Sequence, residues 1–153
     1  MAAFAGGACP ARERIALHEC AECAELRSAF AGVRWESMPD TLIEAHEISL
    51  PLLSPEAFAY FLPAYMLYAL DHLSSRHSAS EHTVYAVGPD KPVNEDHADW
   101  HRTRFKALTR QQAAVMEDFL ALVENDPEFG SYLGDVAERR EQFRELWESR
   151  WSA

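Results

Sequence analysis

The sequence predicts a mainly α-helical protein that folds as one domain, residues 1–153. Its 153 residues suit one hydrophobic core, since domains typically have about 100 to 150 residues. Apolar residues recur at helical spacing along most of the chain, and several of these stretches follow helix-start signals. We therefore expect a bundle of about five to six helices around a central apolar helix kinked at Pro63, with one extended segment near 83–87.

Two helices are expected before residue 50. An alanine-rich segment from Pro10 to about Phe30 has a narrow apolar stripe, and proline suits the first helical position. Further on, Asp40 can cap a two-turn helix that carries Ile43.

The central helix is expected from Pro55 to about Leu73. Ser54 can accept a hydrogen bond from a first-turn amide, and Pro55 needs no donor at that position. Apolar residues cover nearly every face, so other elements should surround this helix. The expected core joins Phe58, Phe61, Leu62, Tyr65 and Leu70 of this helix to Val115, Phe119, Leu122, Phe143 and Trp147 of later ones.

The chain between this helix and residue 108 is expected to be mostly irregular. Residues 74–81 are polar, Thr83–Val87 has the β-branched character of an extended segment, and residues 89–97 contain turn signals. A short helix is expected from Asp99 to Leu108.

The last third of the chain has clear helix-start signals. Thr109 and Gln112 match a capping box, in which each side chain accepts a hydrogen bond from the backbone of the other. Asp126 can cap a further short turn, and Gly134 precedes the last predicted helix.

The composition narrows the class of protein. The net charge is -11, from 14 Lys plus Arg and 25 Asp plus Glu, so we expect no nucleic-acid partner and no membrane partner. The longest apolar run, Ala57 to Leu70, is shorter than the roughly 20 residues that a membrane-spanning helix needs. Three cysteines near one end fit a reducing cytosol, and the alanine- and arginine-rich composition suggests a bacterial source. We expect a cytoplasmic protein.

Motifs for a reaction are absent from the sequence. It has no Gly-x-Ser-x-Gly elbow and no glycine-rich phosphate loop. We therefore expect no catalytic residue and no cofactor.

Acidic residues are concentrated in two blocks that contain no Lys or Arg. Residues 35–75 hold six acids and residues 111–138 hold seven. A solvated acidic surface is the simpler interpretation. The functional interpretation is an acidic face for a basic protein, as in a toxin-neutralising immunity protein. The candidate partner-binding residues are Glu36, Asp40, Glu44, Glu47, Glu117, Asp118, Glu124 and Glu128.

Histidines and cysteines suggest metal binding as an alternative. His97 and His101 would lie one helical turn apart, the spacing that lets two imidazoles share a zinc ion, with His72 or His77 as a third ligand. Such a site could belong to a metal-binding protein or a metal-dependent enzyme. Two cysteines three residues apart, at positions 20 and 23, have the spacing of a redox or zinc pair, but the sequence places them inside a helix.

Aromatic residues suggest two further alternatives. Tyrosines and phenylalanines around Pro63 could line the pocket of a small-ligand sensor, although such runs are usually core. The run Trp100–Lys106 interleaves basic and aromatic residues like a nucleic-acid contact, yet fits one face of an amphipathic helix, with Trp100, Phe105 and Leu108 inward.

Two motifs carry a resemblance to a known family. They are Leu53-Ser54-Pro55-Glu56-Ala57-Phe58 and Tyr60-Phe61-Leu62-Pro63-Ala64-Tyr65. They resemble the central motif of an uncharacterised family of small bacterial proteins, over roughly Arg27 to Trp147. The resemblance implies a mostly helical single domain and brings no catalytic residues.

Overall fold

The computed structural model describes residues 1–151, with their side chains except at 97 and 149–151. Within this range the chain forms eight α-helices and no strand, which confirms the mainly α-helical class. The α-helices are α1 (Ala21–Phe30), α2 (Asp40–Ala45), α3 (Pro55–Asp71), α4 (Ser78–Val87), α5 (Glu95–Phe105), α6 (Arg110–Asn125), α7 (Phe129–Leu133) and α8 (Val136–Trp151). Short 3-10 turns are η1 (Ala2–Phe4), η2 (Arg12–Arg14), η3 (Trp35–Ser37), η4 (Leu50–Leu52) and η5 (Leu73–Ser75).

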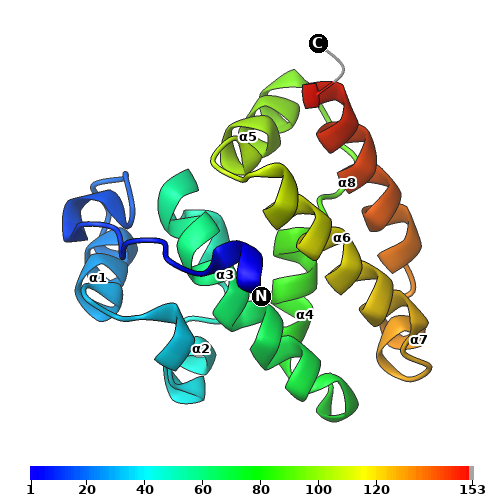
Figure 1. The fold of residues 1–153 in the computed structure, drawn as a ribbon, viewed down its shortest axis with the longest axis horizontal. Helices are drawn as coiled ribbons and strands as arrows, with labels where there is room; N and C mark the ends of the chain where they lie inside the picture. Colours follow the sequence, from blue (N-terminus) through cyan, green and yellow to red (C-terminus); the bar gives the residue numbers. More distant parts are fainter. Residues whose placement is uncertain (152–153) are drawn as a thin grey trace.

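Helices α3 and α4 pack against each other at the centre of the molecule (Figure 1). The pair α6 and α8 lies on one side, where short α7 joins its two members, and α1 and α2 lie on the other side. Buried residues from all of these regions form one hydrophobic cluster.

Helix α3 starts as the sequence predicts. The Ser54 hydroxyl accepts a hydrogen bond from the N–H of Ala57 at 3.1 Å, and Pro55 follows as the first helical residue. The helix continues through Pro63 to Asp71 without a break. Most of its side chains are buried, so this helix is the centre of the core.

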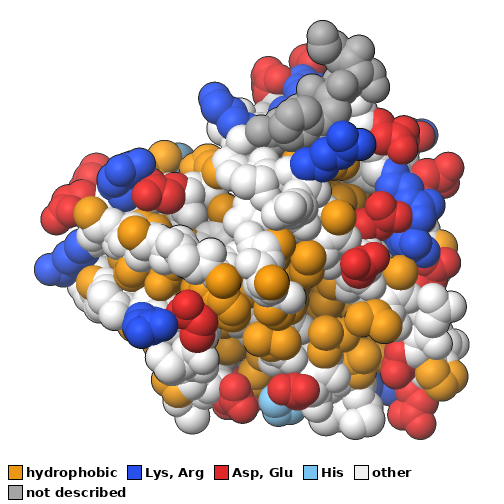
Figure 2. Space-filling view, viewed as in Figure 1, with side chains coloured by type: hydrophobic (Ala, Val, Ile, Leu, Met, Phe, Trp, Pro, Cys, Tyr) orange, Lys and Arg blue, Asp and Glu red, His pale blue; other side chains and the backbone are white. Residues whose placement is uncertain are grey.

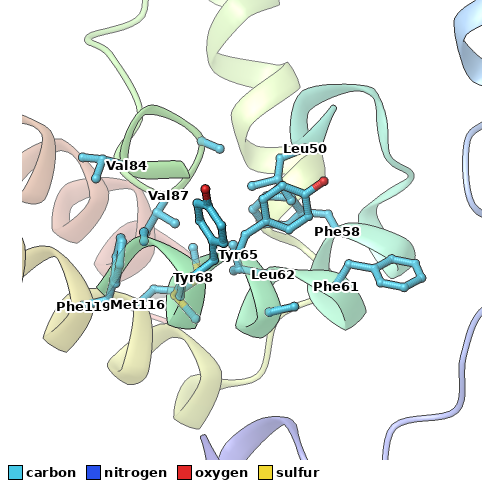
Figure 3. Close-up of a cluster of buried hydrophobic side chains, with 14 of the residues drawn as sticks. Leu50, Phe58, Phe61, Leu62, Tyr65, Tyr68, Val84, Val87, Met116 and Phe119 are labelled. Atoms are coloured by element: carbon cyan, nitrogen blue, oxygen red, sulfur yellow. The ribbon is translucent and has the colours of Figure 1, made fainter. Parts of the chain in front are cut away.

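The predicted core is confirmed in most of its members. Figure 3 shows Phe58, Phe61, Leu62 and Tyr65 of α3 in one cluster with Val84 and Val87 of α4 and with Met116 and Phe119 of α6. Phe143 also belongs to this cluster. Leu122 was wrongly assigned to it, since this side chain is 58% exposed. Helix α4 contacts both α3 and α8. The expected packing of α3 on α8 is therefore largely indirect, with α4 between the two helices.

The expected extended segment near 83–87 is wrong, because these residues form the last part of α4. Buried positions at 79, 80, 83, 84, 86 and 87 give a helical stripe that packs on α3. The Thr83 hydroxyl donates to the carbonyl of Ala79 at 2.7 Å, which satisfies it within the helix. Tertiary packing therefore overrides the β-propensity of Thr83–Val87.

The first helix begins at Ala21, eleven residues later than expected at Pro10. Ile15 and Ala16 are buried in a non-helical segment before it. Arg27 of α1 donates to the carbonyls of Ala16 and His18, both at 2.9 Å. The arginine thus supplies the hydrogen bonds that a helix would otherwise give these carbonyls.

Helices after residue 90 follow the sequence signals more closely. Helix α5 is the exception, since it runs from Glu95 to Phe105 and begins inside the expected loop. The capping box of α6 is present, with Thr109 Oγ1 accepting from the Gln112 N–H at 3.2 Å. Asp126 Oδ1 accepts at 2.7 Å from the N–H of Phe129, the first residue of α7, although the N-cap of this helix is Glu128. At Gly130 a Cβ atom would lie 2.6 Å from the carbonyl oxygen of Val123, so only glycine lets α7 approach α6 this closely.

Candidate functional site

The candidate carboxylates of the first acidic block lie in η3, on α2 and just after α2. Asp40 and Glu44 are one turn apart on this helix and both are exposed, while Glu47 follows the helix and is half-buried. Glu36, in η3, is within 3.6 Å of Arg34. Among the described residues, no Lys or Arg lies within ion-pair distance of Asp40, Glu44 or Glu47.

Neutral hydroxyls hold two of these carboxylates in place. Tyr68 of α3 donates from its hydroxyl to Glu44 Oε1 at 3.0 Å, and Ser78 of α4 donates to Glu47 Oε2 at 2.5 Å. Burial and the bond to Glu44 both raise the pKa of Tyr68, so its phenol remains a donor at neutral pH. The two hydroxyls therefore orient these carboxylates, and the ring nitrogen Nε2 of His77 also lies 3.8 Å from Glu44 Oε1.

Four glutamates line one groove between α1 and the end of α2. Glu22 and Glu25 of α1 line it together with Glu44 and Glu47, and its volume is about 330 Å³. Ile48, which is 59% exposed, adds an apolar wall. A negatively charged groove with an apolar wall suits the aliphatic stem and charged head of a lysine or arginine side chain.

The second acidic block is partly neutralised within the fold. Glu117 is paired with Arg140 and Arg144 of α8, and Glu124 is paired with Arg140 at 2.9 Å. Asp118 and Glu128 are exposed. On the face in Figure 2, acidic side chains lie around the rim in separate groups, interleaved with basic ones beside α8, while hydrophobic side chains occupy the centre. Nothing in the described part of the chain places the carboxylates of this block beside those of the first one, so a shared acidic patch stays a prediction.

Histidines of the predicted metal site are divided between two places. His72 and His77 lie beside Tyr68, with their ring centroids 6.2 Å apart, and His72 Nδ1 is bonded to the carbonyl of Tyr68 at 2.8 Å. His101 is buried on α5, beside Phe105. The side chain of His97 lies outside the described residues. Within the described set, no three His, Cys, Asp or Glu side chains are grouped as metal ligands.

The run Trp100–Lys106 is helical as far as Phe105, but the burial of its side chains differs from the expectation. Phe105 is buried as predicted, whereas Trp100 is 41% exposed. Arg102 is exposed and paired with Glu95 and Asp99 of the same helix. Arg104 is buried, so this helix has no continuous basic stripe.

The cysteine pair lies at the start of α1: Cys23 is inside the helix as expected, whereas Cys20 is the residue before it. Cys20 is the exposed N-cap residue, and its sulfur accepts from the N–H of Cys23 at 3.4 Å. Hydrogen bonding by Cys23 lowers the pKa of Cys20, whereas burial raises the pKa of Cys23. An exposed thiol with a lowered pKa therefore lies next to a buried thiol with a raised pKa.

Sequence reasoning missed the glutamates at 22 and 25 and the burial of Arg104. The two glutamates belong to an alanine-rich helix with Arg27 nearby, outside both acidic blocks. Their part in the groove depends on how α1 sits against α2, which local patterns do not specify. The burial of Arg104 could not be predicted from the sequence, because its basic neighbours suggested a solvent-exposed helix face.

Comparisons with known proteins bear on the family alone. None of the curated proteins and none of the solved structures compared with the chain matches it. No helix in the part of the chain that the structure describes has the length and apolar character to cross a membrane. A family described as "Family of unknown function (DUF6714)" matches residues 17–151, which is most of the chain and includes the motifs around Pro63. The protein therefore belongs to this family of unknown function.

Proposed function

We propose that this protein is an acidic binding module of the bacterial cytoplasm that recognises a basic protein, in the manner of a toxin-neutralising immunity protein. The recognition surface is the groove lined by Glu22, Glu25, Glu44 and Glu47, which we call the acidic groove. A lysine or arginine side chain of the partner enters this groove, and no chemical reaction follows.

The four glutamates that line one groove support this proposal most directly. Opposite charge at this site would attract a cationic partner, and the net charge of -11 would add long-range attraction. The exposed Ile48 side chain would contact the aliphatic part of the incoming residue. Glu36 and Asp40 would extend the contact surface along η3 and α2.

Paired carboxylates are weaker candidates for this role. Glu117 and Glu124 already bind Arg140 and Arg144, and a partner would have to displace these arginines to use them. The proposal therefore places recognition at the acidic groove and assigns Glu117 and Glu124 to the packing of α6 on α8.

The test begins with a binding partner isolated from extract of the protein's own cells at low salt. Its affinity is then measured for the wild type and for a variant that carries Glu25→Gln and Glu44→Gln, one from each wall of the groove. Glutamine keeps the size of both side chains and an acceptor for the Tyr68 hydroxyl. We expect affinity to fall about tenfold, since exposed ion pairs contribute up to about 1 kcal/mol each.

A matched control carries Glu141→Gln and Glu145→Gln. Both side chains are exposed on α8, so this variant loses the same charge elsewhere on the surface. Its affinity should stay within about twofold of the wild type, because distant exposed charges contribute little. Equal losses in the two variants, or a partner that is itself acidic, would contradict the proposal.

A further inference from the structure

Arg104 of α5 is a buried arginine with unsatisfied donors. The residue is 5% exposed, and its Nε and Nη2 atoms have no hydrogen-bond partner among the described residues. Two aromatic rings flank the guanidinium, with its carbon 4.2 Å from the ring centroid of Phe58 and 4.9 Å from that of Trp100. These ring contacts partly stabilise the charge of the guanidinium. They give no hydrogen-bond acceptor to its Nε and Nη2 donors.

The other buried arginine, Arg139, has hydrogen-bond and ion-pair partners for its guanidinium. It donates to the carbonyl of Gly88 at 2.9 Å and to Asp135 at 2.8 Å, and it also pairs with Asp90. Arg104 has no such acceptor in the described structure, although burying an unpaired charge is costly. An acceptor from outside the chain would remove this cost.

A pocket of about 150 Å³ adjoins Arg104. Its polar lining includes Thr103, Ser54 and His18, and no carboxylate is among the described residues that line it. The rest of the lining is mostly apolar, from the segment that ends at Pro55 and from Trp100. In a chain with a net charge of -11, a pocket with a buried cation and no carboxylate favours an anion.

Apolar walls narrow the chemical class of this anion. A strongly hydrated ion such as phosphate would lose much of its hydration there without enough donors in return. A carboxylate on a small apolar or aromatic body would place its charge at Arg104 and its body against Trp100 and Pro51. Arginine also matches the carboxylate geometry, since its donors can bind both oxygens.

We propose that Arg104 and the adjoining pocket form a binding site for a small organic carboxylate with an apolar body. None of the carboxylates of the acidic groove lines this pocket, so the site is independent of the function proposed above. Trp100 lies on the pocket wall and over the guanidinium, so its side chain has to shift when a ligand reaches the buried donors.

The test uses two probes of nearly equal shape, phenylacetate and its uncharged analogue phenylacetamide. Dissociation constants are measured by calorimetry, and tryptophan fluorescence reports on the surroundings of Trp100. The wild type should bind phenylacetate at least about tenfold more tightly than phenylacetamide, because only the carboxylate makes charge-assisted bonds to Arg104. This comparison needs no variant and therefore does not depend on how a substitution affects folding.

Two variants complete the test. Arg104→Met should weaken phenylacetate binding at least about tenfold, and without ligand it should unfold at the same or a higher temperature than the wild type, since it removes an unpaired buried charge. The control, Arg102→Met, removes an exposed arginine from the same helix and should change phenylacetate binding less than about twofold.

The opposite results would overturn the proposal. They are equal binding of the two probes, no binding of phenylacetate at millimolar concentration, or unchanged binding by Arg104→Met. Tighter binding of inorganic phosphate than of phenylacetate would contradict the proposed ligand class.

Discussion

At the scale of single residues, Arg139 links α8 to the C-terminal end of α4 by a side-chain hydrogen bond. Its guanidinium binds the Gly88 carbonyl, and its side chain is 10% exposed. The carbon of this guanidinium also lies 4.2 Å from the ring centroid of Tyr85. Burial and a hydrogen bond to Glu81 raise the pKa of Tyr85 to about 12, so its ring remains neutral at physiological pH.

Replacing Arg139 with methionine should lower the free energy of unfolding by about 2 kcal/mol, since hydrogen bonds to charged groups contribute about 1.5 to 3 kcal/mol. The carboxylates left behind, Asp90 and Asp135, are 64% and 41% exposed and can regain water, which keeps the loss below that for a fully buried pair. Urea denaturation measures this change. Arg102→Met serves as the exposed control, and a similar small loss in both variants would contradict the structural role of Arg139.

The two thiols of α1 should differ in reactivity. Cys20 is exposed with a lowered pKa, and Cys23 is buried with a raised pKa. A lowered pKa means that the thiolate of Cys20 forms at lower pH than that of an unfolded thiol. We expect iodoacetamide to modify Cys20 at least about tenfold faster than Cys23, with its half-maximal rate shifted to lower pH. Mass spectrometry of time points measures both, and equal rates in the folded protein would contradict this assignment.

At the scale of elements, the helices that the sequence predicts best are those with local start signals. Ser54 before α3 and Thr109 before α6 accept first-turn hydrogen bonds as expected. Helix α4 was missed because its β-branched residues have little intrinsic helix preference, and its form depends on packing against α3. The start of α1 was predicted too early because the carbonyl of Ala16 is not bonded within a helix. It accepts instead from the side chain of Arg27, eleven residues after Ala16. Start signals act locally, while these two errors arise from distant contacts.

The two N-caps should differ in their contribution to stability. The Ser54 hydroxyl is buried and has two roles, since it accepts from Ala57 and also donates to the carbonyl of Arg14 at 2.5 Å. Ser54→Ala should therefore cost about 2 to 3 kcal/mol, because it removes the partner of the buried Ala57 N–H and that of the partly buried Arg14 carbonyl. Thr109 is exposed, and Thr109→Ala should cost about 1 kcal/mol. Thermal unfolding of both variants gives the comparison, and an equal or reversed order would show that Ser54 acts only as an ordinary cap.

At the scale of the whole molecule, the charge pattern in the sequence identified half of the acidic groove. Glu44 and Glu47 belong to a long stretch without Lys or Arg, so they could be selected from the sequence. Glu22 and Glu25 could not, since they join the groove only through the packing of α1 beside α2. The same lack of long-range information made Glu117 look available, although Arg140 and Arg144 of α8 neutralise it in the fold.

Ionic strength should distinguish a local groove from a general effect of net charge. Association of oppositely charged proteins is accelerated by their field, and salt weakens this effect as the Debye length falls to about 10 Å at 0.1 M. With a basic partner, the association rate of the wild type should therefore fall steeply as salt rises. The variant with Glu25→Gln and Glu44→Gln should start lower and fall less steeply, because it has lost charge where the partner docks.

Stopped-flow measurement of association rates at several salt concentrations tests this prediction. The variant with Glu141→Gln and Glu145→Gln has the same net charge as the groove variant, so any effect of total charge alone is equal in the two. If the groove is the docking site, the α8 variant should keep nearly the wild-type rate and slope, because its lost charges lie away from the contact. Identical curves for the two variants would mean that the acidic surface acts only through net charge, and the acidic groove would then have no special part in recognition.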